Sequence, residues 1–348
     1  MKLSFCLIAA VFLTILPARA EKILLVAGGI KDGMGIPATE AKLKEPFGVD
    51  FDRAGNLFII EMAMGNRLLK VDAKGVLTHL AGTGQAGFSG DGGPALAAEF
   101  NGPHNLAVLP DGNVLIGDTW AGRVRKVDVT AGTVTSLAGY AVPADRARGS
   151  GPYCITPDFT GTKLFIADLT RIHELDLTTG KARIVAGNGK KGRPEDGTLA
   201  TDAPLSDPRA VASDRQGNLY ILERGGNALR VVTPDGRIKT VVNASGKKGG
   251  TGDGGPALEA TMNGPKHLCI DLQDNVIIAD AESHLVRKFT PKDGRITRVA
   301  GTGKQGKGSL GGSPLECDLA RPHGVTVHRD GTLYITDSYN HRILKIVK

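Results

Sequence analysis

The chain has 348 residues, 41% of them hydrophobic, and carries 43 basic against 36 acidic residues, a formal net charge of +7. A chain of this length can bury a large core. Four cysteines in so long a chain argue against a small fold held together by disulfides.

The first twenty residues have the features of a secretory signal peptide. Lys2 supplies the positive start, residues 3–16 are apolar, and residues 18–20 (Ala-Arg-Ala) form a small-x-small cleavage site. This apolar run is shorter than the roughly 20 residues that cross a membrane, so a membrane anchor is less favoured. No cysteine follows the cleavage site, so a lipoprotein is not indicated. We therefore expect a mature chain, from Glu21, that is secreted or periplasmic.

Removal of this segment changes both the charge and the cysteine count. Without Lys2 and Arg19 the chain has 41 basic and 36 acidic residues, a net charge of +5. Cys154, Cys269 and Cys317 remain, and because three is an odd number at least one thiol is unpaired. We expect buried free thiols rather than a disulfide framework.

A long unit repeats six times along the rest of the chain. Each unit opens with a proline, and successive prolines are 49 to 57 residues apart. The six are Pro46, Pro103, Pro152, Pro208, Pro265 and Pro322. A fixed long period is the signature of repeated supersecondary units.

The sixth unit is completed by the other end of the chain. It runs only from Arg321 to Lys348, and its missing last segment is similar to residues 23–29 (ILLVAGG), which match residues 297–303 (TRVAGTG) of unit five. A repeat divided between the two termini closes a ring of repeats. We therefore expect residues 23–29 to form a closing strand.

Each unit consists of four short apolar segments separated by turns. In unit six these include residues 322–327, 333–337 and 342–346, and residues 294–301 give the fourth segment of unit five. They are rich in Val, Ile, Leu and Tyr, are bounded by Gly, Asp, Asn or Pro, and lack helical periodicity. Four antiparallel strands of this kind make one propeller blade. The predicted fold is all-β, a six-bladed β-propeller formed as one domain by residues 21–348.

The units also resemble a known family. The pattern P-x-G-V-x-x-D-x-x-G-N-L-Y-I-x-D-x-x-N-x-R-I is similar to the NHL repeat, which implies a six-bladed propeller, here of a secreted, bacterial type. The matching copies are Pro46–Arg67, Gly102–Arg123, Asp207–Arg230 and Arg321–Arg342, with looser copies at Pro152–Arg171 and Pro265–Arg287. The resemblance implies little about function, because propellers serve as binding scaffolds and as enzymes.

The connections between units are rich in glycine and in basic residues. The sequence Gly-Asp-Gly-Gly-Pro-Ala at residues 90–95 returns at 252–257, and we expect a compact turn there, although a calcium or phosphate loop is conceivable. The basic residues follow the Val-Ala-Gly positions and should share the upper face, where the inner strand of each blade begins. They are Lys190, Lys191, Arg193, Lys247, Lys248, Lys304 and Lys307. Such a surface can attract a polyanion, and export makes nucleic acid an unlikely partner.

The upper mouth of the central channel is the candidate binding site. The first residue after each proline should lie near the axis, and His267 lies one step further in. These residues are Phe47, His104, Tyr153, Arg209, Lys266 and His323, joined by the loop residues Trp120, Arg224 and Tyr339. An acid ends the second strand of each blade on the same face, namely Glu61, Asp118, Asp168, Glu223, Asp280 and Asp337. Convergent polar groups of this kind predict a binding site.

The acids also have a structural explanation. In four blades an arginine follows within a few residues, and in NHL propellers such Asp and Arg positions often tie strands together. These arginines are Arg67, Arg123, Arg171 and Arg342.

The two histidine motifs resemble those of another propeller family. Pro-His-Asn-Leu at residues 103–106 and Pro-His-Gly-Val at 322–325 are similar to the Pro-His-x-aliphatic motifs of the peptide α-amidating lyase, in which three such histidines hold a catalytic zinc. The resemblance implies a divalent metal ion such as zinc at His104 and His323, and an active-site arginine at Arg224. It fails at Arg209, where the third histidine is expected, and at Thr170, where that family has a tyrosine.

These patterns favour an exported, non-catalytic recognition scaffold without a cofactor, whose upper face binds a protein or an anionic extracellular polymer. The ligand-binding residues are expected to be His104, Trp120, Arg209, Arg224, Lys266, His267, His323 and Tyr339, with the basic loops beside them. The alternative is a metal-assisted lyase or hydrolase centred on His104 and His323. A third possibility is a structural module of an envelope assembly. The oligomeric state is left open.

Overall fold

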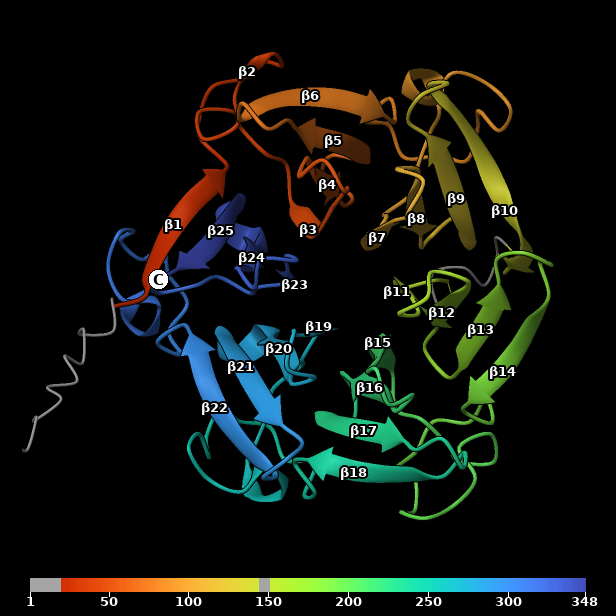
Figure 1. Cartoon of the computed structure of the whole chain (residues 1–348), viewed down its shortest axis with the longest axis vertical. Coiled ribbons are helices and arrows are strands. Elements are labelled where there is room, and N and C mark those ends of the chain that lie inside the picture. The colour runs from red at the N-terminus through yellow and green to blue at the C-terminus, as the bar shows by residue number, and fades with distance from the viewer. Residues whose placement is uncertain (1–19, 144–150) are drawn as a thin grey trace, which may run out of the picture.

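Six antiparallel sheets form a ring around a central channel (Figure 1). The computed structural model describes residues 20–143 and 151–348, so the expected signal peptide lies almost wholly outside the described residues. The predicted six-bladed, all-β propeller is confirmed. No helix in the described ranges is long and apolar enough to cross a membrane.

The strands of each blade follow one another from the channel outward. Blade one contains β3 (Pro46–Phe51), β4 (Leu57–Glu61), β5 (Arg67–Val71) and β6 (Val76–Ala81), with the short β2 (Ile36–Pro37) outside. Blade two contains β7 (Asn105–Val108), β8 (Val114–Asp118), β9 (Arg123–Asp128) and β10 (Thr133–Ala141). Blade three contains β11 (Cys154–Pro157), β12 (Lys163–Ala167), β13 (Ile172–Asp176) and β14 (Ala182–Ala186). Blade four contains β15 (Pro208–Ser213), β16 (Leu219–Glu223), β17 (Ala228–Val232) and β18 (Ile238–Val242). Blade five contains β19 (His267–Ile270), β20 (Val276–Asp280), β21 (Leu285–Thr290) and β22 (Arg295–Ala300).

Blade six joins the two ends of the described chain. It contains β23 (Gly324–Val327), β24 (Leu333–Asp337) and β25 (Arg342–Val347), and its outer strand is β1 (Lys22–Ala27). β1 pairs antiparallel with β25, with Lys22 opposite Val347 (Figure 1). The predicted closing strand is therefore confirmed, although it begins one residue before and ends two residues before the predicted range 23–29.

Short 3₁₀ helices lie in the connections, and they are η1 (Ala95–Ala97), η2 (Ala257–Glu259), η3 (Ala281–Ser283), η4 (Pro314–Glu316) and η5 (Ser338–Asn340).

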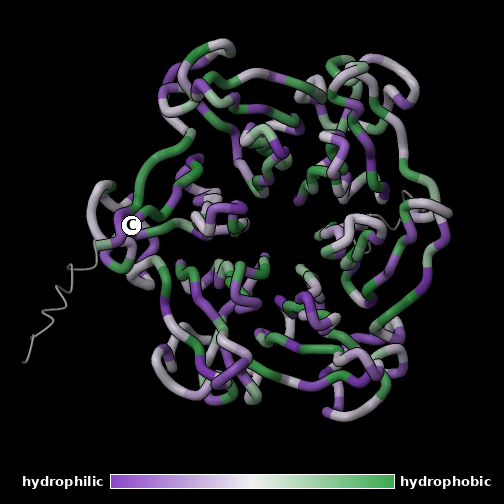
Figure 2. Tube along the Cα trace, viewed as in Figure 1, coloured by the Kyte–Doolittle hydropathy of each residue, from purple (hydrophilic) through white to green (hydrophobic). Residues whose placement is uncertain are grey.

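Apolar side chains pack between the faces of neighbouring blades. Apolar segments run along the strands of every blade (Figure 2). Phe58 and Ile60 of blade one, for example, pack with Leu106 and Ile116 of blade two. Because each blade covers its neighbour, both faces of most sheets are buried, and all five residues of β4 are shielded from solvent.

The inner strands are also joined by side chains that bond to the backbone of the next blade. Asp50 accepts a hydrogen bond from the Val108 N–H at 2.7 Å, and Asn105 accepts one from Ile155 at 3.1 Å. Thr326 donates to the Val49 carbonyl at 2.7 Å, which joins blade six to blade one. These bonds fix the angular positions of the blades around the channel.

The acids that end the second strands are buried in structural ion pairs. The pairs are Glu61–Arg67 at 2.6 Å, Asp118–Arg125 at 3.4 Å, Glu223–Arg230 at 2.8 Å, Asp280–Arg287 at 3.4 Å and Asp337–Arg342 at 2.7 Å. Each of these acids also accepts the N–H of a residue 17 positions upstream, in the loop that enters the blade.

Two of the expected acid partners were wrong. Asp118 pairs with Arg125 and not with Arg123, whose guanidinium lies 4.7 Å from the centre of the Phe88 ring. Asp168 accepts from the backbone N–H of Arg171 and bonds to His173 at 2.9 Å. The acids therefore have the expected structural role, but in blades two and three their partners differ from the expected arginine side chains.

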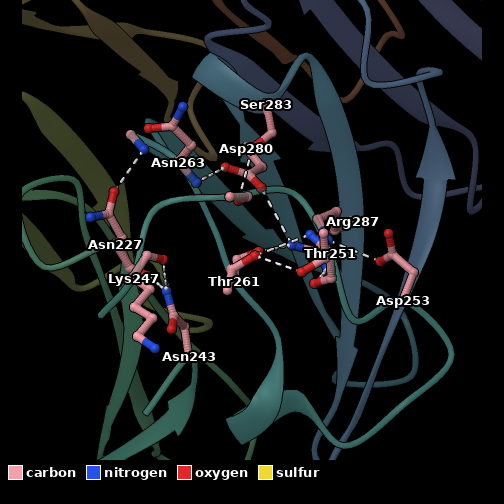
Figure 3. Close-up of polar contacts among 12 residues, drawn as sticks. Asn227, Asn243, Lys247, Thr251, Asp253, Thr261, Asn263, Asp280, Ser283 and Arg287 are labelled. Atoms are coloured by element: carbon pink, nitrogen blue, oxygen red, sulfur yellow. Dashed lines mark hydrogen bonds and ion pairs between the residues drawn. The ribbon is translucent and has the colours of Figure 1, made fainter. Parts of the chain in front are cut away.

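The same buried arginines hold the Gly-Asp-Gly-Gly loops as compact turns. Arg287 reaches Asp253 at 2.9 Å, and it donates to the carbonyl oxygens of Thr251 and Thr261 (Figure 3). Arg125 holds Asp91 in the same way at 3.0 Å. Each loop aspartate thus serves as an ion-pair partner within the fold, as a structural turn requires.

Three free cysteines occur in the described part of the chain, in agreement with the expected absence of a disulfide framework. Cys154 and Cys317 are buried. The expectation of burial was wrong for Cys269, which is partly exposed because its side chain faces the open centre of the ring.

Candidate functional site

The upper mouth of the channel contains a cavity of about 240 Å³. It gathers seven of the eight expected ligand-binding residues, which come from blades two, four, five and six. Its lining consists of Glu45, Phe47, Met62, His104, Trp120, Tyr153, Arg209, Arg224, Lys266, Arg321, His323 and Tyr339. The eighth residue, His267, lies below this cavity and lines a separate one deeper in the channel.

The backbone turns sharply where each blade enters the mouth. The residue before the opening proline has a positive φ, which is 52° at Glu45, 55° at Asp207 and 46° at Arg321. Glycine takes this position in blades two and five, where a Cβ would lie 2.4 Å from Trp120 or Glu282. Non-glycine residues pay a conformational cost for positive φ, and such positions cluster at binding and catalytic sites.

One side of the mouth is an unbroken arc of rings from blades three, two, one and six. Tyr153 meets His104 with 4.8 Å between ring centres, and His104 meets the Phe47 ring edge-on at 5.3 Å. Phe47 stacks on His323 at 4.1 Å, and His323 stacks on Tyr339 at 5.8 Å. Trp120 adds a ring beside His104 at 5.9 Å.

The opposite side is cationic and comes chiefly from blades four and five. Arg209 and Arg224 share Asp207, with Arg209 at 2.8 Å. Lys266 and Arg321 share Glu282, with Lys266 at 3.6 Å. Two cations for each acid leave each cluster with a net charge of +1.

Arginines at both ends join the two sides. Arg209 lies over the Tyr153 ring at 3.8 Å, and Arg321 lies over Tyr339 at 4.7 Å. Stacked guanidinium groups are held in place without losing their outward donors.

Both mouth histidines are neutral and have the same tautomer. The Nδ1–H of His104 donates to the Gly102 carbonyl at 2.8 Å, and that of His323 donates to Arg321 at 2.8 Å. Burial and the charge of Arg209 lower the pKa of His104 to about 3. Burial and Lys266 hold the pKa of His323 well below its usual range. Each Nε2 therefore carries a lone pair, and neither has a hydrogen-bond partner among residues 20–143 and 151–348.

The cavity ends on a hydrogen bond that crosses the channel. Asn105 of blade two donates to the Nε2 of His267 of blade five at 3.0 Å, and these blades face each other across the ring (Figure 1). The equivalent positions of the other four blades hold small residues, namely Gly48, Cys154, Ala210 and Gly324. The mouth cavity and the channel cavity of about 250 Å³ below it share no lining residue. We call this Asn105–His267 contact the channel bar.

The donor set at the mouth does not fit a divalent cation. His104 and His323 lie on either side of Phe47, and the described chain contains no cluster of three His, Cys, Asp or Glu side chains able to hold a metal. Arg209 occupies the position of the third histidine that the lyase resemblance requires. Glu45, the acid that lines the cavity, accepts a hydrogen bond from the Met64 N–H at 3.2 Å, and the neighbouring Asp207 and Glu282 are already paired with cations.

The basic loops are exposed and lie outside the cavity. Lys190, Lys191, Arg193, Lys247, Lys248, Lys304 and Lys307 are all exposed. They follow the outermost strands β14, β18 and β22, whose ends face the same side as the cavity because the strands alternate in direction. They surround the mouth at a distance and add positive charge to its approach.

Four charged residues of the site were missed by the sequence reasoning. Glu45, Asp207 and Arg321 directly precede an opening proline, and Glu282 follows the acid that ends β20. The sequence signal was their position next to the predicted mouth residues. The prediction considered the residue that follows each opening proline and left out the residue that precedes it.

Comparisons with known proteins agree with this fold. The model of the NHL repeat matches residues 319–346. NHL repeat-containing protein 2 of Gallus gallus is 25% identical over 345 residues, which covers 86% of this chain and 46% of that protein. Teneurin-m of Drosophila melanogaster is 25% identical over 73% of this chain and 10% of its own length. The chain thus spans less than half the length of these curated relatives.

Solved structures show the same architecture at low sequence identity. An auxiliary nutrient binding protein from Bacteroides thetaiotaomicron has a TM-score of 0.67 at 14% identity, over 94% of this chain and 76% of that chain. A streptogramin B lyase has a TM-score of 0.57 at 16% identity, over 94% and 98% of the two chains. At these identities the likeness concerns the fold alone.

Proposed function

We propose that this chain, an NHL-repeat six-bladed β-propeller, is a recognition scaffold whose upper mouth binds an anionic segment of a protein or of an extracellular polymer. The observation that carries the proposal is the convergence of Arg209, Arg224, Lys266 and Arg321 on one cavity with an aromatic wall. Arginine and lysine donors in a partly desolvated cavity select carboxylate, sulfate or phosphate groups.

We further propose that the protein works outside the cytoplasm. Residues 1–20 have the composition of a secretory signal. Propellers of the same fold from Bacteroides are named as auxiliary nutrient binding proteins, which is consistent with a binding role at or beyond the envelope.

The alternative, a metal-assisted lyase or hydrolase at His104 and His323, has weaker support. Structural neighbours named as lyases favour it, and so do the two Nε2 lone pairs. The positive charge of Arg209 and Lys266 opposes it, because a dication in the same cavity would be repelled.

Charge changes in the cavity and on the basic loops should affect binding differently. The Arg209→Gln/Lys266→Gln variant should lose retention on polyglutamate-agarose and on polygalacturonate-agarose at about 50 mM salt, because the anion loses two direct partners. Reversal to Glu of Lys247, Lys248, Lys304 and Lys307 should weaken retention and reduce its salt dependence, because these residues steer the approach.

A matched control reverses four charges on the lower face. Arg53, Lys74, Lys181 and Lys292 are exposed and lie in the hairpin turns at the opposite ends of the strands. Their replacement by Glu should leave more retention than the loop variant does. Equal loss in both would mean that net charge alone governs retention, and unaltered retention in the cavity variant would refute a binding site at the mouth.

Binding of an anion should weaken as the pH rises above about 8. Burial and the nearby arginines lower the pKa of Lys266 to about 8 in the unliganded cavity. Deprotonation removes one positive charge, and a bound anion in turn raises this pKa. Affinity should therefore fall from about pH 8 up to the higher pKa of the complex. Titration of retention or affinity against pH measures the effect. In Lys266→Arg the cation persists throughout this range, so its profile should be flat; an identical decline in both proteins would assign the titration to another group.

A further inference from the structure

Three sets of side chains in the cavity determine which chemical groups a ligand needs. The cationic side, formed by Arg209, Arg224, Lys266 and Arg321, requires an anionic group. The two Nε2 lone pairs of His104 and His323 are hydrogen-bond acceptors and require a hydroxyl or N–H donor. The arc of rings offers flat faces to a rigid group with exposed C–H bonds.

The floor and the size of the cavity limit the ligand further. The channel bar separates the mouth from the cavity below, so a chain that enters the mouth ends there. A volume of about 240 Å³ lies below the roughly 300–1,000 Å³ of pockets for drug-sized ligands. The cavity therefore admits about one compact residue, with the remainder of a polymer directed outward past the basic loops.

On the basis of the function proposed above, we propose that the mouth binds the terminal hexuronate of an acidic polysaccharide end-on. A uronate has a carboxylate for the cationic side, hydroxyl groups for the two imidazoles, and a rigid ring whose C–H bonds can lie against Tyr153, Phe47 or Tyr339. These groups occupy one residue, as the blind cavity requires.

Other anions satisfy only part of this set. A phosphate or an acidic side chain meets the cations but brings no rigid C–H face to the rings. The ionised oxygens of either group also repel the lone pairs of His104 and His323. Neutral histidines beside four cations are thus suited to a ligand that combines an acid with hydroxyl donors.

Calorimetry with short oligomers tests the proposal. The probes are trigalacturonate, trimannuronate and triglucuronate, with galactotriose and triglutamate as the neutral sugar and the acidic peptide. At least one uronate trimer should bind about tenfold or more tightly than both comparison ligands. Each dodecamer of the same uronate should bind one protein molecule with an affinity close to that of the trimer, because only the end of the oligosaccharide fits the cavity.

Variants assign the binding to the cavity. Lys266→Gln and His104→Ala/His323→Ala should each weaken binding of the uronate trimer about tenfold or more, whereas Lys239→Gln, an exposed lysine of β18, should bind as the unaltered protein does. Thermal unfolding of each variant shows whether the fold is retained. The histidine pair should matter less for triglutamate, because their role is to accept hydrogen bonds from hydroxyl groups.

The outcomes separate this proposal from the broader one. If triglutamate binds as tightly as every uronate trimer, or if several proteins bind along one dodecamer, the end-on uronate proposal is wrong. If no trimer binds while polyglutamate-agarose still retains the protein through Arg209 and Lys266, it is also wrong, and the recognition function stands. If the cavity variants alter neither assay, both proposals fail.

Discussion

Replacing Arg287 by methionine should lower the free energy of unfolding by about 3–5 kcal/mol, because removal of one partner leaves a buried charge without compensation. Arg287 is fully buried and bonds to Asp280, Asp253 and the carbonyl oxygens of Thr251 and Thr261 (Figure 3). Its loss releases both the end of β20 and the loop that enters blade five. Chemical denaturation followed by tryptophan fluorescence and circular dichroism measures the change.

Two further variants show whether the cost comes from the buried charge. Arg298→Met alters an exposed arginine of the neighbouring strand β22 and should cost less than about 0.5 kcal/mol. Adding Asp280→Asn to Arg287→Met removes the uncompensated carboxylate and should restore part of the lost stability. If Arg287→Met and Arg298→Met were equally stable, the loop anchor would not be energetically important.

Deletion of residues 23–29 should open the ring. β1 supplies the outer strand of blade six, and Ile23 and Ala27 are fully buried within it. Without β1, strand β25 has an unpaired edge, which invites pairing with another molecule. We expect a lower unfolding temperature and soluble aggregates, measured by calorimetry and size-exclusion chromatography.

Point variants in the same strand give a graded version of this test. Ile23→Ala should cost about 2–5 kcal/mol, since it creates a cavity at a fully buried position. Lys22→Ala, at the exposed start of β1, should have little effect. An unchanged melting temperature in the deletion variant would show that the ring does not depend on this closure.

The blades and the mouth residues were predictable because each follows from counting along a repeat. The opening prolines fix where the inner strands begin, so the residue after each proline had to lie near the axis. This placed Arg209, Lys266 and His323 correctly. The charged partners Asp207 and Glu282 were not predicted. Asp207 lies at a left-handed backbone turn that its residue type does not announce, and Glu282 lies in η3, just after the end of β20.

Two other features depend on spacing across the molecule. Arg123 and Arg125 lie on the same side of β9 and both contact Phe88. The fully buried Arg125, which also reaches Asp91, is the one that pairs with Asp118. The channel bar depends on whether side chains from opposite blades can meet. That distance is set by the diameter of the ring and not by the sequence near Asn105 or His267.

The pairing of β1 with β25, which closes blade six, limits the order in which the ring can fold. β1 is synthesised before the other described strands of the ring, yet β25, the strand with which it pairs, comes after all five other blades. During that interval Ile23 and its neighbours lack the strand with which they pair, so this pairing cannot form until β25 has been made. In a chain exported unfolded, β1 and β25 would pair only on the far side of the membrane. Export would then precede closure of the ring.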